Sequence, residues 1–264
     1  MGDWRFQGID LPGPVSIIPP FNILVAQKIT YVNQLGVPTM IGAAPGICVP
    51  GIAYDCSWLI DGYQTPSGVS GLTSVYQTDV LANLETDLDA LNSPNAVITG
   101  LDLQSANQCF AVSSLQISQE GGFNLMRQWI APTDLQAVAA QLGQESRVVT
   151  ALSFNAGQLY VLSYGWQSDT TTIYEVNIVS ATGDTYVSQG MSLAAQGYII
   201  TAIGGDPTDG LLLVGTRVKG DTMPRPADYA DYQGLHGSLP PNIQPLSRDI
   251  FGSSPNTEIW ISEQ

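Results

Sequence analysis

Charged residues are scarce in this chain of 264 residues. Asp, Glu, Lys and Arg make up 12% of it, against about 25% in an average soluble protein. Only 8 residues are Lys or Arg and 23 are Asp or Glu, so the net charge is −15. This negative charge repels phosphate backbones and anionic lipids, which argues against nucleic acid and membrane surfaces as partners. A surface rich in hydroxyl and amide groups instead favours an exported protein.

Long apolar runs are also absent. The best stretch, Val15 to Ala26, is interrupted by Pro19 and Pro20 and falls short of the roughly 18–20 residues that span a bilayer. The first residues, Met1 to Arg5, lack the basic start and apolar core of a signal peptide. We therefore expect a periplasmic or extracellular protein whose leader has been removed.

Cysteine and histidine are rare, with three and one copies. No Cys-x-x-Cys motif occurs, so the sequence supports neither zinc nor thioredoxin chemistry, and we expect no metal and no cofactor. Cys48 and Cys56 lie in one loop with Pro and Gly, where a disulfide and two free thiols are equally consistent with the sequence. Cys109, beside Phe110 in a strand-like run, is expected to be a buried thiol.

What the chain does have is a repeat of fixed length. Segments 97–101, 148–152 and 199–203 read VITGL, VVTAL and IITAI, and their threonines are 51 positions apart. Self-similarity at such a period is typical of a supersecondary unit that has been copied and packs on its neighbours.

Each unit is predicted to run strand, helix, strand, strand. In one copy, Thr133 and Gln136 have the spacing of a capping box, and Gly143 is expected to end the helix. The apolar stripe of this helix is Leu135, Val138, Ala139 and Leu142. The turn 155–157, Asn-Ala-Gly, then favours a hairpin between two strands.

Other copies follow the same pattern. Helices are predicted over 81–91 and over 184–196, the second ended by Gly197, and a degenerate fourth copy is predicted around 31–41. Because this first unit lacks a leading strand, the C-terminal strand, 257–261, is predicted to complete it and so close a ring. Closure would remove exposed sheet edges.

This layout resembles the β/α-propellers, rings of repeated strand–helix units around a pseudo-symmetry axis. The resemblance covers architecture alone and implies no catalytic residues. The predicted fold class is therefore α+β, with four tandem strand–helix–strand–strand repeats of about 51 residues closed into a ring. Two packed pairs of units without a ring, or an all-β propeller with four-stranded blades, are the alternatives.

Two segments fall outside the repeat. Residues 1–20 contain several prolines and are predicted to form an extended arm, with 21–264 as a single repeat-built domain. Residues 219–256 are predicted to be a long inserted loop. Either segment could reach a neighbouring copy of the chain, so a homo-oligomer is a further expectation.

The inserted loop is the candidate catalytic site, with His236 as a base that Asp228 or Asp231 orients. Binding candidates in the same loop are Arg225, Tyr229, Tyr232 and Arg248. The alternative is that tyrosines and prolines pin the loop across the fold while its charges stay solvated. No nucleophile elbow or paired-carboxylate spacing supports the catalytic interpretation.

Acidic and aromatic residues offer two weaker sites. Around the first helix a solvated acidic face is favoured over a calcium site, because EF-hand spacing is absent. This acidic cluster is Asp79, Glu85, Asp87 and Asp89. Near the predicted strands, tryptophans are expected mainly to pack, with stacking on sugar rings as the alternative. These tryptophans are Trp58, Trp129, Trp166 and Trp260.

Three functions follow from these features. The first is a non-catalytic exported module that binds a protein partner or assists an assembly. The second is a hydrolase with its site under the inserted loop, around His236. The third is carbohydrate binding through Trp and Tyr. The repeat, the low charge and the long loop favour the first.

Overall fold

The structure, a computed structural model, describes residues 5–10, 15–17, 39–44, 47–49, 53–56, 59–64, 72–104, 108–117, 122–167, 169–181, 185–206, 210–225, 227–231, 245–247 and 257–261. The first strands are β1 (Arg5–Asp10), β2 (Val15–Ile17), β3 (Thr39–Ala44), β4 (Ile47–Val49), β5 (Ala53–Cys56) and β6 (Leu59–Gln64). The middle of the chain forms β7 (Leu72–Val80), α2 (Leu84–Leu91), β8 (Ala96–Gln104), β9 (Cys109–Ile117), β10 (Phe123–Ile130), α3 (Leu135–Gln144), β11 (Arg147–Asn155) and β12 (Gln158–Trp166). The last elements are β13 (Tyr174–Ala181), α4 (Tyr186–Ala195), β14 (Ile199–Asp206), β15 (Gly210–Val218), β16 (Ala227–Asp231), β17 (Pro245–Ser247) and β18 (Thr257–Ile261).

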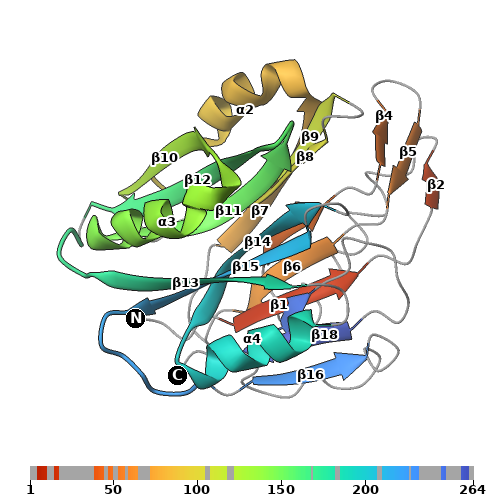
Figure 1. The fold of residues 1–264 in the computed structure, drawn as a ribbon. Helices are drawn as coiled ribbons and strands as arrows, with labels where there is room; N and C mark the ends of the chain where they lie inside the picture. Colours follow the sequence, from red (N-terminus) through yellow and green to blue (C-terminus); the bar gives the residue numbers. More distant parts are fainter. Residues whose placement is uncertain are drawn as a thin grey trace.

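The fold is a mixture of helices and antiparallel strands, as the α+β prediction requires (Figure 1). The described strands form six three-stranded sheets, and in each sheet the strand that comes last along the chain lies in the middle. The orders are β1-β6-β3, β2-β5-β4, β7-β9-β8, β10-β12-β11, β13-β15-β14 and β16-β18-β17. In three of these sheets a helix joins the first strand to the second: α2, α3 and α4.

Four of the sheets share an irregularity at the same place. The pairing skips one residue of β3, β8, β11 and β14, as in a β-bulge. The skipped residues are Ile41, Thr99, Thr150 and Thr201. The three threonines of the sequence pattern therefore mark bulges, which bend a strand and increase its twist.

Three of the sheets are layered, with β10-β12-β11, called here the central sheet, in the middle. Its middle strand, β12, is buried along nearly its whole length, because both faces of the sheet are covered. One face packs against α2 and sheet β7-β9-β8, a contact region called here the α2 junction. The other face packs against α3 and sheet β13-β15-β14, called here the α3 junction. Each helix thus lies between its own sheet and the next (Figure 1).

Hydrophobic cores fill both junctions. The predicted helical stripes face these cores, so burial of apolar area stabilises the layers. The α2 junction buries Leu84, Leu88 and Leu91 of the helix with Phe110, Val112, Leu162 and Tyr164 of the strands. The α3 junction buries Leu135, Ala139 and Leu142 with Val149, Leu152, Val161 and Val214.

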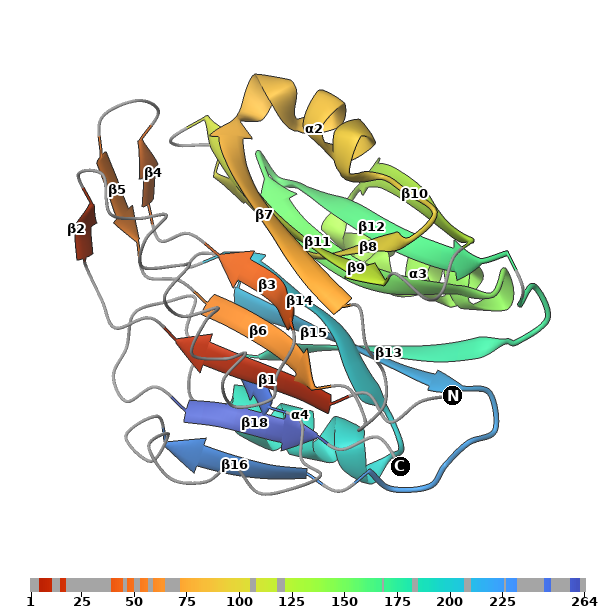
Figure 2. The same cartoon turned by 180° about the vertical axis from the view of Figure 1, so that it is seen from behind.

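The prediction that the C-terminal strand completes the first unit was wrong. Strand β18 pairs with β16 and β17, and the first set has its own leading strand, β1, which pairs with β6. Residues 5–10 therefore belong to a sheet, although the sequence predicted an arm there, and residues 219–256 contain β16 and β17. Strand β1 does lie beside β18 (Figure 2). The pairing partner of a short strand is decided by distant segments, which local pattern does not reveal.

Helix ends follow the sequence signals only in part. The hairpin turn is as predicted, because Ala156 and Gly157 both have positive φ between β11 and β12. Gly197 has φ +86° just after α4, as a C-terminal glycine should. Gly143, however, lies inside α3, and the expected capping box is absent because the 3₁₀ turn before α3 begins at Pro132 without a side-chain cap.

Candidate functional site

The predicted catalytic loop is only partly described. In β16 the backbones of Asp228, Tyr229 and Asp231 pair with β18. Three other candidates lie outside the described residues: Tyr232, His236 and Arg248. The catalytic interpretation, which depends on His236, stays a prediction.

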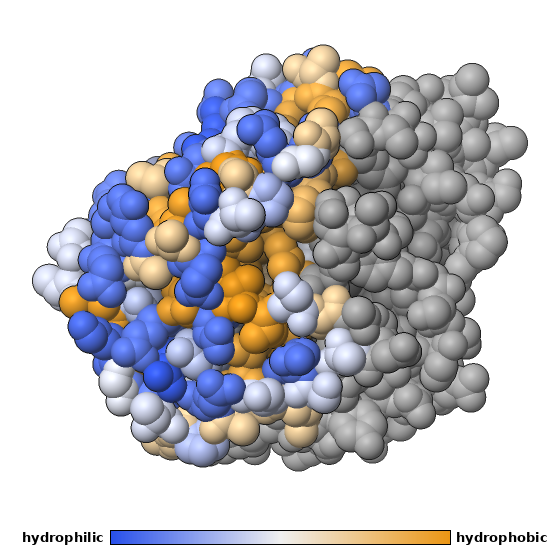
Figure 3. Space-filling model, viewed as in Figure 1, coloured by the Kyte–Doolittle hydropathy of each residue, from blue (hydrophilic) through white to orange (hydrophobic). Residues whose placement is uncertain are grey.

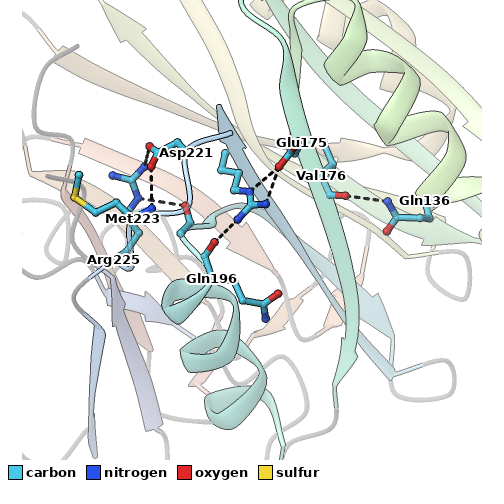
Figure 4. A network of polar contacts seen from close by, with 9 residues as sticks. Gln136, Glu175, Val176, Gln196, Asp221, Met223 and Arg225 are labelled. Atoms are coloured by element: carbon cyan, nitrogen blue, oxygen red, sulfur yellow. Dashed lines mark hydrogen bonds and ion pairs between the residues drawn. The ribbon is translucent and has the colours of Figure 1, made fainter. Parts of the chain in front are cut away.

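Arg225, a predicted binding residue, holds the end of α4 (Figure 4). Its Nε donates to the carbonyl oxygen of Gly197 at 3.2 Å, and its Nη2 lies 2.7 Å from Oδ2 of Asp221. Its backbone N–H donates to the carbonyl oxygen of Ala194 at 2.8 Å. With only 9% of its side chain exposed, Arg225 acts as a helix-end support in this structure.

A second arginine supports the same end of α4. Arg217 donates through Nη1 to the carbonyl oxygen of Gln196, and its Nη2 lies 2.7 Å from Oε2 of Glu175. Its guanidinium also lies 4.4 Å from the ring centroid of Tyr198. Helix C-termini favour cations because their carbonyl groups carry partial negative charge. The arginines in the polar network of Figure 4 therefore stabilise the C-terminal end of α4.

The possible disulfide between Cys48 and Cys56 is not found among the residues that the structure describes. The register of β4 and β5 places Cys48 opposite Tyr54, so Cys56 lies two positions further along its strand. Such a diagonal pair has backbones about 7–8 Å apart, more than the usual separation in a disulfide.

A charged cluster lies where α2 meets the outer strand of the central sheet. Arg127 of β10 places Nε 2.9 Å from Oε2 of Glu85 and Nη2 2.8 Å from Oδ1 of Asp89. The carboxylates are 55% and 67% exposed and the guanidinium side chain 24%. Glu85 and Asp89 are four residues apart on α2, so they share one face of the helix. Part of the predicted acidic face is thus tied to β10.

Tyrosine and tryptophan complete this cluster. The hydroxyl of Tyr160 donates to Oε1 of Glu85 at 2.6 Å, a charge-assisted hydrogen bond. Burial raises the pKa of Tyr160 well above its usual range, and the Glu85 carboxylate raises it further. The ring of Trp129 lies 4.5 Å from that of Tyr160, centroid to centroid. Trp129 therefore packs on one side, as predicted, while 41% of it is exposed.

Exposed apolar side chains concentrate on β10. Among the described residues, three large hydrophobic side chains are exposed, and two of them, Met126 and Trp129, lie on this strand at 39% and 41%. The third is Met223, at 61%, in the turn after β15. Because β10 is the outer strand of its sheet, these side chains flank a sheet edge.

The edge of β10 differs from the equivalent edge of β13. At β13, the Gln136 side chain of α3 donates to the carbonyl oxygen of Val176 at 2.9 Å and accepts from the N–H of Ile178 at 3.0 Å. One amide thus pairs with the edge as a neighbouring strand would. At β10, 51 positions earlier, Glu85 occupies the place of Gln136 but bonds to side chains.

The outward backbone groups of β10 follow from its register. The N–H of Phe123 points away from β12, because it donates to the carbonyl oxygen of Pro94 at 2.9 Å. Residues two and four positions on point the same way in an antiparallel pair, so Leu125 and Arg127 face outward too. Within the described part of the chain, the Leu125 carbonyl and the Arg127 N–H have no hydrogen-bond partner.

Figure 3 shows a second apolar area, over β13 between α3 and α4. Strand β13 contributes Val176 and Ile178, which are partly buried and pack against the core of the α3 junction. Gln136 pairs the backbone there, so this area extends the core and offers no free strand edge.

No group of three or more metal-ligating side chains occurs among the described residues. None of the described helices is both long enough and apolar enough to cross a bilayer. Comparison with protein-family models, curated proteins and solved structures finds no significant match for this chain.

Sequence reasoning missed the edge of β10. The signal was available in the repeat: Glu85 and Gln136 are 51 positions apart, and the strand residues they reach, Arg127 and Ile178, are also 51 apart. A difference in residue type at matching positions of two copies points to a difference in role.

Proposed function

We propose that this chain is a non-catalytic exported module that binds a partner or assists an assembly. The observation that carries the proposal is the exposure of Met126 and Trp129 on one outer strand, where they project to opposite faces of the sheet on either side of its edge. The low charge and the acidic composition support export.

The scaffold we infer is a ring of tandem units, similar to a β/α-propeller. Three observations support it: the shared strand order of the sheets, the bulges at matching positions, and the neighbouring positions of β1 and β18. The ring would contain five units, with β16-β18-β17 as the last, where the sequence suggested four. A circular permutant that joins residues 264 and 1 and opens at the exposed turn 219–220 should fold. An unfolded permutant would contradict the ring.

The binding proposal is tested by retention of ligands on the immobilised protein. Secreted proteins of the producing organism and an array of glycans are passed over three forms: wild type, the Met126→Ser/Trp129→Ser double variant, and Met223→Ser. We expect the double variant to lose at least tenfold in retention. Met223→Ser, which changes an apolar side chain that is more exposed but distant in the fold, should retain binding. Equal retention by all three forms would contradict a binding role for β10.

Carbohydrate is a second candidate ligand because the exposed ring of Trp129 could stack on a sugar. Specific retention on the glycan array that Trp129→Ala abolishes would favour carbohydrate, and the absence of binding to any glycan would exclude it.

Self-association through residues 1–20 or 219–256 is a separate proposal. Native mass spectrometry tests it, and a monomer at all concentrations would exclude it.

A further inference from the structure

We propose that β10 binds an extended, basic segment of a partner protein, which adds to the central sheet as a fourth strand. This inference rests on the proposed binding function and names the site and the chemistry of the partner. Strand addition uses main-chain hydrogen bonds for affinity and alternate side chains for specificity.

The α3 junction shows which groups such a strand would satisfy. Gln136 donates to one outward carbonyl of β13 and accepts from the N–H two residues later. These two contacts are the ones that a neighbouring strand makes with its peptide groups. The matching groups of β10, the Leu125 carbonyl and the Arg127 N–H, lie at the same positions and receive nothing from α2.

The spacing of the helices favours an added strand at β10 over one at β13. The backbone of α3 runs close along β13, and a Cβ on Gly143 would lie 2.5 Å from the carbonyl oxygen of Tyr174. The backbone of α2 lies further from β10, and long side chains bridge the two. An additional strand needs about 4.8 Å of separation from its neighbour, which close helix packing does not leave.

Charge selects a basic segment. Helix α2 carries Glu85, Asp87 and Asp89 and no basic residue, and β10 offsets these carboxylates with Arg127 alone. The carboxylates of Glu85 and Asp89 are more than half exposed beside the open edge. A partner strand with Lys or Arg on the side toward α2 would be attracted, whereas a second copy of this chain, with a net charge of −15, would be repelled.

The probe is a blocked seven-residue peptide in which lysine and valine alternate. Binding is followed by amide hydrogen exchange of β10, read at Arg127, and by titration. We expect the peptide to slow exchange at Arg127 at least tenfold. A version N-methylated on every residue, which has no backbone N–H to donate from either edge, and a version with glutamate for lysine should leave exchange unchanged.

Two variants of the protein separate strand addition from simple charge attraction. Glu85→Gln and Asp89→Asn each replace a carboxylate by a neutral amide and so remove one negative charge and one ion pair with Arg127. Only a glutamine at position 85 can pair with the β10 edge as Gln136 pairs with β13, so we expect Glu85→Gln to weaken peptide binding at least tenfold and Asp89→Asn no more than about threefold.

Equal weakening by the two variants would show charge attraction alone and overturn strand addition. Absence of protection at Arg127, or equal binding of the N-methylated peptide, would overturn it too. The wild-type protein could retain ligands in the retention experiment and yet fail to bind the lysine–valine peptide as an added strand. In that case the proposed binding function stands and this inference fails. If the wild-type protein forms a dimer and Glu85→Gln dissociates it, the occupant of the β10 edge is a second copy of this chain, which overturns the proposal of a basic partner segment.

Discussion

The two junctions on either side of the central sheet bury similar apolar residues but close in different ways. At the α2 junction, hydroxyl groups and charges make the connection: Tyr164 accepts from the N–H of Ile98 at 2.9 Å, and Thr150 donates to the Ile98 carbonyl at 2.6 Å. At the α3 junction, glycines allow the chains to touch, since a Cβ on Gly204 would lie 2.6 Å from the Leu152 carbonyl oxygen. Around its apolar core, the α2 junction is joined by side-chain hydrogen bonds and ion pairs, whereas the α3 junction is joined by close approach of the backbones.

This difference has a consequence at the outer edges. A helix that packs closely, as α3 does, brings an amide within reach of the neighbouring strand and covers its edge. A helix held by long charged side chains, as α2 is, leaves the edge uncovered. Sheets with the same strand order can therefore differ in whether a helix covers their outer edge, although exposed edges are normally protected.

The largest effect is expected from filling the close contact of the α3 junction. Gly143→Ala forces a Cβ against the backbone oxygen of Tyr174, and we expect a loss of about 2 kcal/mol in the free energy of unfolding. The matching position in α2, 51 residues earlier, is the exposed Asn92, and Asn92→Ala should change stability by less than about 0.5 kcal/mol. Urea unfolding measures both. Equal losses would mean that the two junctions are packed alike.

A smaller loss is expected from removing a hydroxyl of the α2 junction. Tyr164→Phe leaves the buried N–H of Ile98 without its acceptor, which should cost about 1–2 kcal/mol at neutral pH. Because Tyr164→Phe removes the hydroxyl and keeps the aromatic ring, the packing of the ring in the α2 junction is preserved. An unchanged stability would show that the bond contributes nothing to this junction.

The same tyrosine predicts alkaline sensitivity. Burial raises the pKa of Tyr164 to about 12, above the value of about 10 in an unfolded chain. The protonated phenol therefore stabilises the fold fully below pH 10, and this stabilisation is lost as the pH rises through about 12. Between pH 8 and pH 11 the wild type should lose more stability than Tyr164→Phe, by about 1 kcal/mol. Parallel losses would contradict the raised pKa.

The smallest expected effect is a difference in salt dependence between the contact of α2 with β10, made by Glu85, and the contact of α3 with β13, made by Gln136. Glu85→Ala removes one ion pair with a partly exposed arginine and the charge-assisted hydrogen bond from the Tyr160 hydroxyl, and Gln136→Ala removes hydrogen bonds of a neutral amide. Each should cost about 1 kcal/mol at low salt. In 1 M NaCl the cost of Glu85→Ala should fall while that of Gln136→Ala persists, because salt screens charges and not neutral hydrogen bonds. Equal salt dependence would contradict the assignment.

Local pattern predicted the elements better than their partners. The stripe from Leu135 to Leu142 and the turn at Gly157 were confirmed because both depend on neighbours in sequence. The role of Gln136 was not predictable, because its spacing from Thr133 fits a capping box equally well, and only the position of β13 decides between the two. The predicted pairing of β18 was wrong for the same reason, since the sequence of a short strand does not identify its partner.

Of the candidate site, the sequence identified the acidic face of α2 and Trp129 but did not connect them. Arg127 connects them in the fold, and its ion pairs with Glu85 and Asp89 join the central sheet to α2. Arg225 of the predicted loop supports the end of α4. The sequence could not predict this contact, because Arg225 and the helix end meet only in the folded chain.

Amide hydrogen exchange at two matching positions tests the central claim most directly. The N–H of Ile178 is bonded to Gln136, and the N–H of Arg127, 51 positions earlier, faces outward from an uncovered edge. In the isolated protein, we expect Arg127 to exchange at least tenfold faster than Ile178 after correction for intrinsic rates. Equal protection of the two amides would show that the β10 edge is already covered and would contradict the account.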